Sequence, residues 1–479
     1  MDEMEIKEAL DLETESEYEY EYEAIQEQQA DELSELLERR DMKQLKTRME
    51  ELNEFDVAEF LSEIEDNRMP MVFRLLSKTA AADVFANMDV PDQERIINSV
   101  TDSELAGLVE ELYVDDAVDM MEELPANVVA RIMRIATPQT RNLINQYLRY
   151  PENSAGSIMT SEFVDLKKYM SVKESIARIR RIGADKETIY VCFVTTMDRK
   201  LEGIVSVKDL LLNDDDMIIE DLMDRNVIFA STTDDQEAVS EMFSDYDLMA
   251  MPVVDKENRL VGIVTVDDVI DVMEQEATED FDIMAGILPS DIPYSRSPIF
   301  ELFKNRIPWL MFMMLSATFT SMILTSFEDM LAVQAGLVAF IPMLMGTGGN
   351  SGAQSSTAVI RSLSLGDTET SDALKVVWRE LRVAFLCGIA LAAVNFVKML
   401  LLDGMLLNND AVTVSVAATV SLTIIFVVLF AKVVGSMLPI LAEKLGLDPA
   451  VMANPLISTV TDAVSLLIYI FVAKLILNI

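Results

Sequence analysis

Histidine is absent from this 479-residue chain, and cysteine occurs only twice, at Cys192 and Cys387. Without imidazole the chain cannot build histidine zinc sites, Ser-His-Asp triads or the usual centre of an intramembrane zinc protease. Two cysteines far apart in the sequence give no disulfide framework, which fits a reducing cytosol. Any bound metal ion must therefore be held by oxygen ligands, which suit hard cations such as Mg²⁺ and Ca²⁺.

Positive charge is scarce in the first 300 residues. That part carries 70 acidic and 28 basic residues, whereas the rest of the chain carries 12 acidic and 10 basic ones. The formal net charge of −44 therefore belongs almost wholly to the first part. Such a field repels nucleic acid and attracts cations, so we expect no nucleic-acid partner.

Three soluble regions follow one another before the apolar part. Residues 1–31 are dense in acids and predict a disordered extension. Residues 32–150 carry leucine and valine at three- and four-residue spacing, with short breaks at prolines. This pattern predicts an all-α domain in which short helices stack as a superhelix of small repeats.

A clearer repeat lies in residues 151–265. The segment 201–211 (LEGIVSVKDLL) returns 59 residues later as 260–270 (LVGIVTVDDVI), and each copy has the pattern of a strand followed by a helix. The repeat resembles a tandem pair of CBS (cystathionine-beta-synthase) domains, which are α/β regulatory modules. Residues 266–300 follow as an acidic connecting helix and linker.

The apolar part, residues 301–479, contains five uncharged stretches, each giving a helix near the roughly 20 residues that cross a bilayer. These stretches are 307–327, 330–360, 383–397, 411–431 and 449–461, the last resuming after one aspartate. Basic residues fall on one side of the predicted spans, at Lys304, Arg306, Arg361, Lys375, Arg379, Arg382, Lys432 and Lys444. By the positive-inside rule we expect a multi-pass protein of the bacterial inner membrane, with a cytoplasmic amino terminus and an external carboxyl terminus.

Asp462 is the only charged residue between Pro449 and Ala473. A carboxylate in the middle of a membrane helix costs about 2.5–3.5 kcal/mol on insertion scales, so it needs a partner or a function. A structural partner is one interpretation, with Lys432 or Lys474 as the candidate cation. Lys474 lies about 18 Å further along the same helix, which favours a function in a hydrophilic pathway.

Two polar features accompany Asp462. A stripe of Asn454, Ser458, Thr461 and Ser465 follows helical spacing beside it. Residues 346–356 (GTGGNSGAQSS) interrupt an otherwise apolar span and can admit close helix approach or face a water-filled cavity. Ordinary helix packing through small polar residues is the alternative interpretation of both. A phosphate-binding loop is excluded, because the Gly-Lys-Ser/Thr element is missing.

Together these segments resemble the MgtE magnesium transporters over about residues 32–479. The resemblance depends on residues 150–160, the paired CBS repeats, residues 276–280 (EATED), residues 346–356 and residues 447–456 with Asp462. It implies a homodimer in the lipid bilayer, with a pore on the two-fold axis lined by the second and fifth spans. It also implies that Asp462 is the selectivity carboxylate, with Asn454 in a polar ring on its cytosolic side and Ser458 along the pore.

Acids crowd the helix that leads to the membrane. A solvated face is the ordinary interpretation of any single one of them. In MgtE-like proteins this helix lies over the cytosolic pore mouth, and Mg²⁺ bridges its acids to those of the CBS and amino-terminal domains. The resemblance assigns regulatory Mg²⁺ to Asp268, Asp271, Glu276, Glu279 and Asp280, with Asp92, Glu94 and Asp115 as the guessed partners.

The CBS repeats also place a hydroxyl and a carboxylate where such domains hold the ribose of an adenine nucleotide. The residues are Ser206 and Asp209 in the first copy and Thr265 and Asp268 in the second. ATP is therefore a second expected ligand beside transported and regulatory Mg²⁺.

We expect a Mg²⁺-selective channel or transporter for magnesium uptake that closes when cytosolic Mg²⁺ binds its soluble domains. The alternatives are a CBS-regulated transporter of Co²⁺, Mn²⁺ or Ca²⁺ and a transporter of an anion or osmolyte, against which Asp462 argues. An enzyme is disfavoured, because the sequence offers no histidine and no nucleophile–base pair. The sequence leaves channel and coupled transporter equally open.

Overall fold

A computed structural model describes residues 28–65, 67–290, 294, 297–328, 335–406, 412–452 and 454–477. The chain separates into two compact units, Met1–Val272 and Met273–Ile479. Most of the predicted acidic extension, residues 1–27, lies outside the described residues, and residues 28–31 already belong to a helix.

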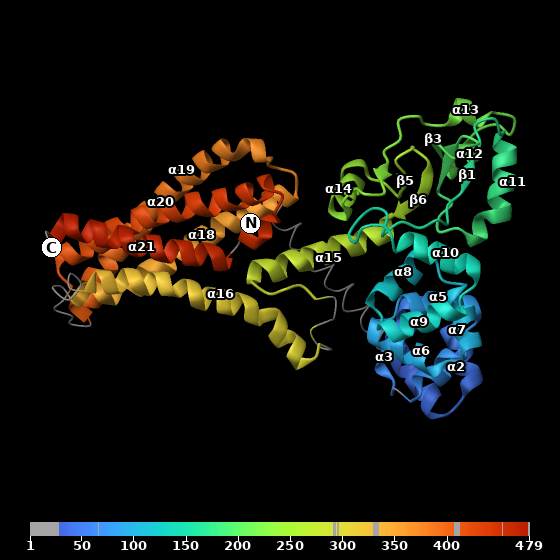
Figure 1. Ribbon diagram of the computed structural model, residues 1–479, viewed down its shortest axis with the longest axis horizontal. Coiled ribbons are helices and arrows are strands. Elements are labelled where there is room, and N and C mark those ends of the chain that lie inside the picture. The colour runs from blue at the N-terminus through green and yellow to red at the C-terminus, as the bar shows by residue number, and fades with distance from the viewer. Residues whose placement is uncertain are drawn as a thin grey trace, which may run out of the picture. The chain divides into compact units, whose positions relative to one another are not determined.

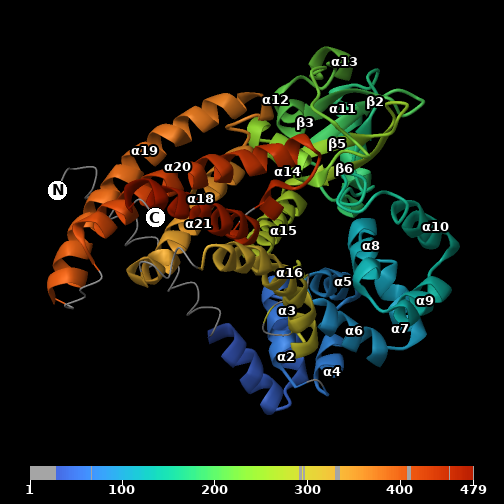
Figure 2. The same cartoon turned by 60° about the vertical axis from the view of Figure 1, so that its left-hand side comes forward.

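The first unit begins with a stack of short helices, seen side by side in Figures 1 and 2. The helices are short because caps and prolines start each one anew: Thr101 and Glu104 form a reciprocal capping box, and proline occupies the first turn of three helices. Alternate helices pack together, α3 on α5, α5 on α7 and α7 on α9, which is the predicted superhelix. Their bounds are α2 (Met42–Met49), α3 (Glu54–Glu63), α4 (Met69–Phe73), α5 (Lys78–Ala86), α6 (Val90–Ser99), α7 (Asp102–Val109), α8 (Val114–Glu123), α9 (Ala126–Ile135) and α10 (Pro138–Tyr147).

Two three-stranded sheets of the same topology follow, as the sequence repeat predicts. In each sheet the first strand is parallel to the second and the second is antiparallel to the third. The register repeats at the 59-residue interval, because Cys192 pairs with Val205 and Met251 pairs with Val264. The strands are β1 (Asp165–Leu166), β2 (Val191–Thr195), β3 (Leu201–Ser206), β4 (Ala230–Ser231), β5 (Ala250–Val254) and β6 (Leu260–Thr265). The accompanying helices are α11 (Val172–Ile182), η1 (Gly183–Asp185), α12 (Val207–Leu212), α13 (Ile219–Leu222) and α14 (Gln236–Tyr246).

Helix α15 (Val266–Ala285) directly follows strand β6 and runs from the first unit into the second. It carries Asp268, Asp271, Glu276, Glu279 and Asp280, whereas the expected partners Asp92, Glu94 and Asp115 belong to α6 and α8. The rest of the second unit consists of α16 (Ile299–Ser326), η2 (Ala335–Phe340), α18 (Ile341–Ser364), η3 (Thr370–Asp372), α19 (Ala373–Lys398), η4 (Met399–Leu406), α20 (Val414–Lys444), η5 (Pro449–Met452) and α21 (Asn454–Leu477).

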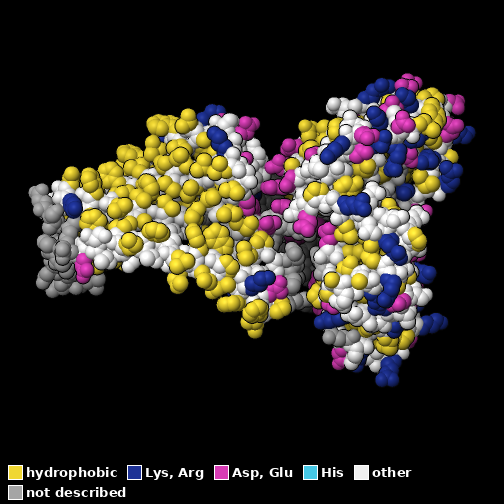
Figure 3. Space-filling view, in the orientation of Figure 1, with side chains coloured by type: hydrophobic (Ala, Val, Ile, Leu, Met, Phe, Trp, Pro, Cys, Tyr) yellow, Lys and Arg dark blue, Asp and Glu magenta, His cyan; other side chains and the backbone are white. Residues whose placement is uncertain are grey.

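Hydrophobic side chains cover the visible face of this second unit (Figure 3). Within the described residues four helical segments are long and apolar enough to cross a membrane: Ile299–Ser326, Thr370–Gly404, Val414–Lys444 and Pro449–Leu477. The second predicted span, 330–360, overlaps α18, whose 24 residues are enough in length, but the glycine, serine and amide segment of α18 lowers its apolar character. The multidomain membrane fold is confirmed, with four apolar helices where the sequence predicts five spans.

Helices α18 and α20 approach each other at glycine. A Cβ on Gly435 would lie 2.2 Å from the carbonyl oxygen of Gly352, and a Cβ on Gly352 would lie 2.6 Å from a side-chain carbon of Ile457. Backbone oxygen cannot move aside as a flexible side chain can. Residue 435 must therefore be glycine for this crossing, as small residues are in many membrane helix pairs.

We expect Gly435→Ala to destabilise the protein by about 1–3 kcal/mol or more, because the added methyl group forces α18 and α20 apart. Gly346→Ala is the matched control, since a Cβ at residue 346 meets nothing within 4 Å and alanine favours a helix. The check is the thermal unfolding midpoint of both variants in the same detergent. Equal midpoints for the two variants would contradict the close crossing.

Candidate functional site

The polar stripe of α21 packs partly against α18. Ser458 lies beside Gly349, with its Oγ 3.5 Å from the position of an added Cβ, and Ser465 lies closer still to Gly348, with its Oγ 2.6 Å from the corresponding position. Thr461 and Ser465 are almost completely buried, and Thr461 donates a hydrogen bond to the carbonyl of Ile457 at 2.7 Å. For these two residues the structure favours the helix-packing interpretation. The side chain of Asn454 lies outside what the structure describes.

Asp462 is partly buried on α21, next to Thr461. Neither lysine considered as its partner pairs with it. Lys432 lies beside Glu380, and the ammonium of Lys474 lies 5.1 Å from the ring centre of Phe327. Among the described residues Asp462 forms no ion pair, so its charge is available to a ligand.

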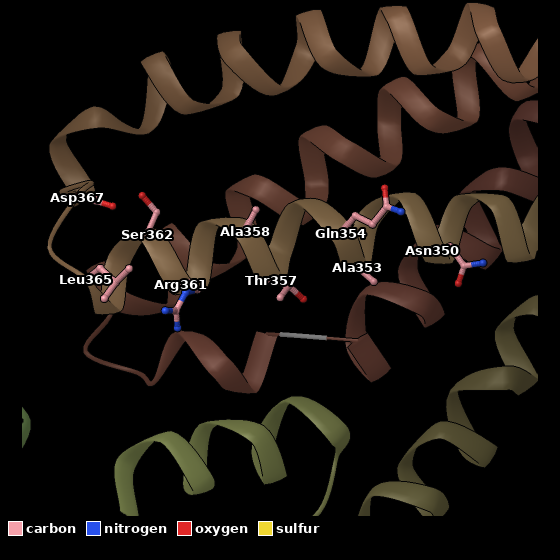
Figure 4. Close-up of a pocket in the computed structure, with 9 residues that line it drawn as sticks. All are labelled: Asn350, Ala353, Gln354, Thr357, Ala358, Arg361, Ser362, Leu365 and Asp367. Carbon is pink, nitrogen blue, oxygen red and sulfur yellow. The ribbon is translucent and has the colours of Figure 1, made fainter. Parts of the chain in front are cut away.

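The second polar face belongs to α18 and lines an open groove of about 880 Å³. Figure 4 shows its side chains spaced along α18 as far as the turn that follows the helix. Four of the polar lining residues follow the i, i+4, i+7, i+11 spacing and so lie on one face of the helix: Asn350, Gln354, Thr357 and Arg361. This spacing is visible in the sequence and could have identified the face. The complete lining is Asn350, Ala353, Gln354, Thr357, Ala358, Arg361, Ser362, Leu365 and Asp367. Gly348, Gly349 and Gly352 of the same segment lie on the buried face instead.

A cluster of acids surrounds the start of α15 in the first unit. Burial and the nearby charge of Asp268 raise the pKa of Asp116 to about 6 and that of Glu187 to about 7. Burial, opposed by a hydrogen bond from Thr265 and reinforced by neighbouring acids, raises the pKa of Asp268 to about 6. Burial also raises the pKa of Asp115 well above its usual range, with Asp116 and Asp268 adding to the effect. The carboxylates therefore repel one another in a desolvated setting.

This cluster differs in part from the predicted one. Asp268 and Asp115 are brought together as expected, whereas Asp92 accepts a hydrogen bond from Arg95 at 2.6 Å. Sequence reasoning missed Asp116 and Glu187. Glu187 belongs to the segment between α11 and β2, so only tertiary folding brings it to α15.

Asp280 lies in a second acidic setting, within the second unit. Burial raises its pKa to about 6, the charges of Asp448 and Glu276 raise it further, and a hydrogen bond from Ser364 opposes the rise. Asp448 lies in the loop that follows α20, so this acidic setting combines Asp280 of α15 with an acid from that loop. Asp271, Glu276 and Glu279 also take part in polar or electrostatic interactions.

The described residues contain no group of three or more Asp, Glu or Cys side chains close enough to hold a metal ion directly. Among the described residues the carboxylates around Asp268 and Asp280 therefore lie near one another without forming a finished coordination shell. Such clusters attract a cation that keeps part of its water shell, as Mg²⁺ does.

The predicted nucleotide residues cap helices. Ser206 Oγ donates to Asp209 Oδ2 at 2.6 Å while the Asp209 amide donates to Ser206 Oγ at 3.0 Å, a capping box at the start of α12. Thr265 Oγ1 donates to Asp268 Oδ2 at 2.6 Å in the same way at the start of α15. Both pairs thus stabilise the start of a helix. Asp268 in addition belongs to the acidic cluster.

Three families match consecutive parts of the chain. Residues 52–153 match the MgtE intracellular N domain, residues 155–215 and 219–275 match CBS domains, and residues 341–472 match MgtE, a divalent cation transporter family. The matches cover the helical stack, both sheets, and α18 to α21.

Relatives agree with this division. The magnesium transporter MgtE of Thermus thermophilus is 35% identical over 457 residues, which cover 95% of this chain and all of that protein. A crystal structure of the soluble part of a magnesium transporter is 31% identical, with a TM-score of 0.51, and covers 53% of this chain and 99% of that one. A structure of the cytosolic domain of the Mg²⁺ channel MgtE in complex with ATP is 35% identical, with a TM-score of 0.48, and covers 51% of this chain and 99% of that one.

An amino-terminal helical stack, a pair of CBS domains and a bundle of membrane helices thus match these families one after another along the chain. The Thermus thermophilus relative aligns with the chain over its whole length. The chain is a multi-pass membrane protein and belongs to the MgtE family.

Proposed function

We propose that this protein conducts Mg²⁺ into the bacterial cell and closes when cytosolic Mg²⁺ binds its soluble domains. The observation that carries the proposal is Asp462, a carboxylate in a membrane helix that forms no ion pair among the described residues. A negative charge in that position is stabilised by a passing cation and destabilised by an anion, so an anion or osmolyte pathway fits it poorly.

The pore is proposed to form between two copies of the chain. One carboxylate only half-neutralises a divalent ion, whereas two carboxylates related by a two-fold axis neutralise it fully. The groove along α18 supports this arrangement, because its amide and hydroxyl groups can contact a hydrated ion through water. Asn454 and Ser458 are proposed to line the cytosolic side of the Asp462 site. Selectivity would then follow the size of the hydrated ion.

Gating is proposed to depend on the acidic clusters. Without a cation, Asp116, Glu187 and Asp268 repel one another, and this repulsion adds to the effect of burial in raising their pKa values. Mg²⁺ between them removes the repulsion, and the same reasoning applies to Asp280 beside Asp448. A state that holds more bound ions is favoured as Mg²⁺ rises, so the closed state is the one in which these clusters are filled. Asp271, Glu276 and Glu279 are proposed to add ligands along α15.

An adenine nucleotide is a further proposed ligand of the CBS pair, through Ser206 with Asp209 and Thr265 with Asp268. The amino terminus is proposed to face the cytoplasm and the carboxyl terminus the outside, from the distribution of basic residues.

We expect Asp462→Asn to leave a folded protein and to reduce Mg²⁺ uptake by at least tenfold, since the amide keeps the shape and loses the charge. Uptake is measured in proteoliposomes at equal protein content. Asp403→Asn is the control, because Asp403 already has a cation, Lys398, 3.1 Å away. Wild-type uptake by Asp462→Asn would overturn the proposed pore site. Repeating the measurement with Co²⁺, Mn²⁺ and Ca²⁺ tests the identity of the ion.

Neutralising Glu276, Glu279 and Asp280 together with amides distinguishes two forms of the gating proposal. If bridging ions close the pore, the triple variant should stay open at millimolar Mg²⁺, because an amide cannot replace an anionic ligand of Mg²⁺. If relief of repulsion is enough, the variant should be closed even without Mg²⁺. We expect the first result, measured as channel current over graded cytosolic Mg²⁺.

The raised pKa values give a pH dependence of stability. The folded state holds protons on Glu187, Asp116 and Asp268 that the unfolded chain has lost, so this stabilisation is complete below about pH 4 and disappears as the pH rises through 6 to 7. In Mg²⁺-free buffer the unfolding midpoint of the full chain should therefore fall between about pH 5 and pH 7.5. Millimolar Mg²⁺ should raise it more at the higher pH, where the carboxylates are charged.

The control for this effect is Na⁺ at equal ionic strength, which screens charge without occupying a site. The double variant Asp116→Asn/Glu187→Gln should lose most of the pH dependence. Equal stabilisation by Na⁺ and Mg²⁺ would show that both ions act only by screening charge, and it would contradict specific Mg²⁺ binding to the cluster.

A further inference from the structure

A second carboxylate is buried among the membrane helices, and it already has a cation. The ammonium of Lys432 on α20 donates to Ser355 Oγ at 3.1 Å and lies 3.8 Å from Glu380 Oε2. Ser355 Oγ in turn donates to the same carboxylate oxygen at 2.6 Å. Only 6% of the Lys432 side chain and 16% of the Glu380 side chain are exposed. The three groups join α18, α19 and α20.

The group lies well inside the second unit. Lys432 is 12 residues from the end of α20 at Lys444, about 18 Å along the helix, and Glu380 is about 10 Å from the start of α19 at Ala373. Ionised groups that are this little exposed are costly when single and become tolerable when paired and hydrogen-bonded. The membrane part of this chain therefore has two carboxylates of different kinds: Glu380 with a cation from the chain itself and Asp462 without one.

We propose that the Lys432 ammonium occupies a cation site formed by Glu380 and Ser355, and so prevents the transported ion from binding there. The proposal rests on the cation-transport function argued above and concerns how ions are confined to one carboxylate. Lys432 is then a specificity-determining residue, which acts by filling a competing site.

Filling that site matters because of where Ser355 lies. Ser355 is on the buried face of α18, and its neighbour Gln354 is on the groove face. The carbonyl of Ala431, next to Lys432, lies 3.2 Å from the position of a Cβ on Gly352, and Thr461, next to Asp462, lies 3.4 Å from the same position. A bare Glu380 would thus hold its charge behind α18, one helix from the groove, and draw cations away from Asp462.

A tethered ammonium is an effective occupant. Because it belongs to the chain, its local concentration at Glu380 exceeds that of a free ion at millimolar level. The ammonium loses its own hydration once, when the chain folds, whereas each Mg²⁺ would have to release water that it holds strongly. The filled site is therefore insensitive to the Mg²⁺ concentrations at which the transporter works.

The test is Lys432→Gln in the full chain, an amide that can still donate to Ser355 but carries no charge. The proposal expects Mg²⁺ to stabilise this variant more than the wild type, with an additional rise in unfolding midpoint of about 2 °C or more between 0.1 and 10 mM Mg²⁺. Lys432→Gln/Glu380→Gln should return to the wild-type response. A purely structural pair predicts a lower midpoint with an unchanged Mg²⁺ response, and that result would overturn the proposal.

Lys398→Gln is the matched control, because Lys398 pairs with Asp403 nearer the end of its helix and outside the Ser355 contact. Should Lys432→Gln fail to fold, the comparison becomes Mg²⁺ uptake by Glu380→Gln, whose unneutralised ammonium should slow uptake several-fold, with recovery in the double variant. Uptake by Glu380→Gln equal to wild type would then refute the proposal. The midpoint measurement requires no transport, so absence of Mg²⁺ uptake in the wild type would refute the proposed function alone.

Discussion

Negative charge held in a poorly solvated place must be neutralised by a cation, and the rest of this structure depends on that requirement. In the membrane part Glu380 meets it within the chain, through Lys432, whereas Asp462 has no partner among the described residues. In the soluble part Asp115 is buried and Asp116 and Asp268 are half-buried near it, so protons or bound cations must reduce their repulsion. The same physical requirement thus underlies the proposed pore and the proposed sensor.

Helix α18 illustrates how one segment meets two demands. Its glycines and serines allow contact with α20 and α21, so that Gly352 approaches the backbone of one and a side chain of the other. Its amides and hydroxyls lie on the opposite side along the groove. The small and polar residues of α18 therefore have two functions, close helix packing on one face and contact with water on the other. Because these residues lower its hydropathy, a criterion based on hydropathy alone does not select α18 as a membrane span.

Helix α15 links the sensor chemistry to the CBS fold. Thr265 and Asp268 cap its start, and the same Asp268 adds charge to the acidic cluster. Loss of an N-cap typically costs about 1 kcal/mol, so a change at Asp268 affects both the helix and the cluster. The corresponding pair in the first repeat, Ser206 and Asp209, caps α12 in the same way.

The sequence by itself determined the order and type of the domains, since helical spacing, a 59-residue repeat and long apolar stretches are local patterns. It also identified Asp462, because a lone charge in an apolar stretch is visible without a structure. Tertiary structure decided which charges have partners. Lys432 pairs with Glu380 rather than with Asp462, and Glu187, from another element, lies near enough to Asp268 for their charges to interact. Such pairings depend on how helices cross and sheets pack, and residues far apart in the chain carry no local signal of meeting.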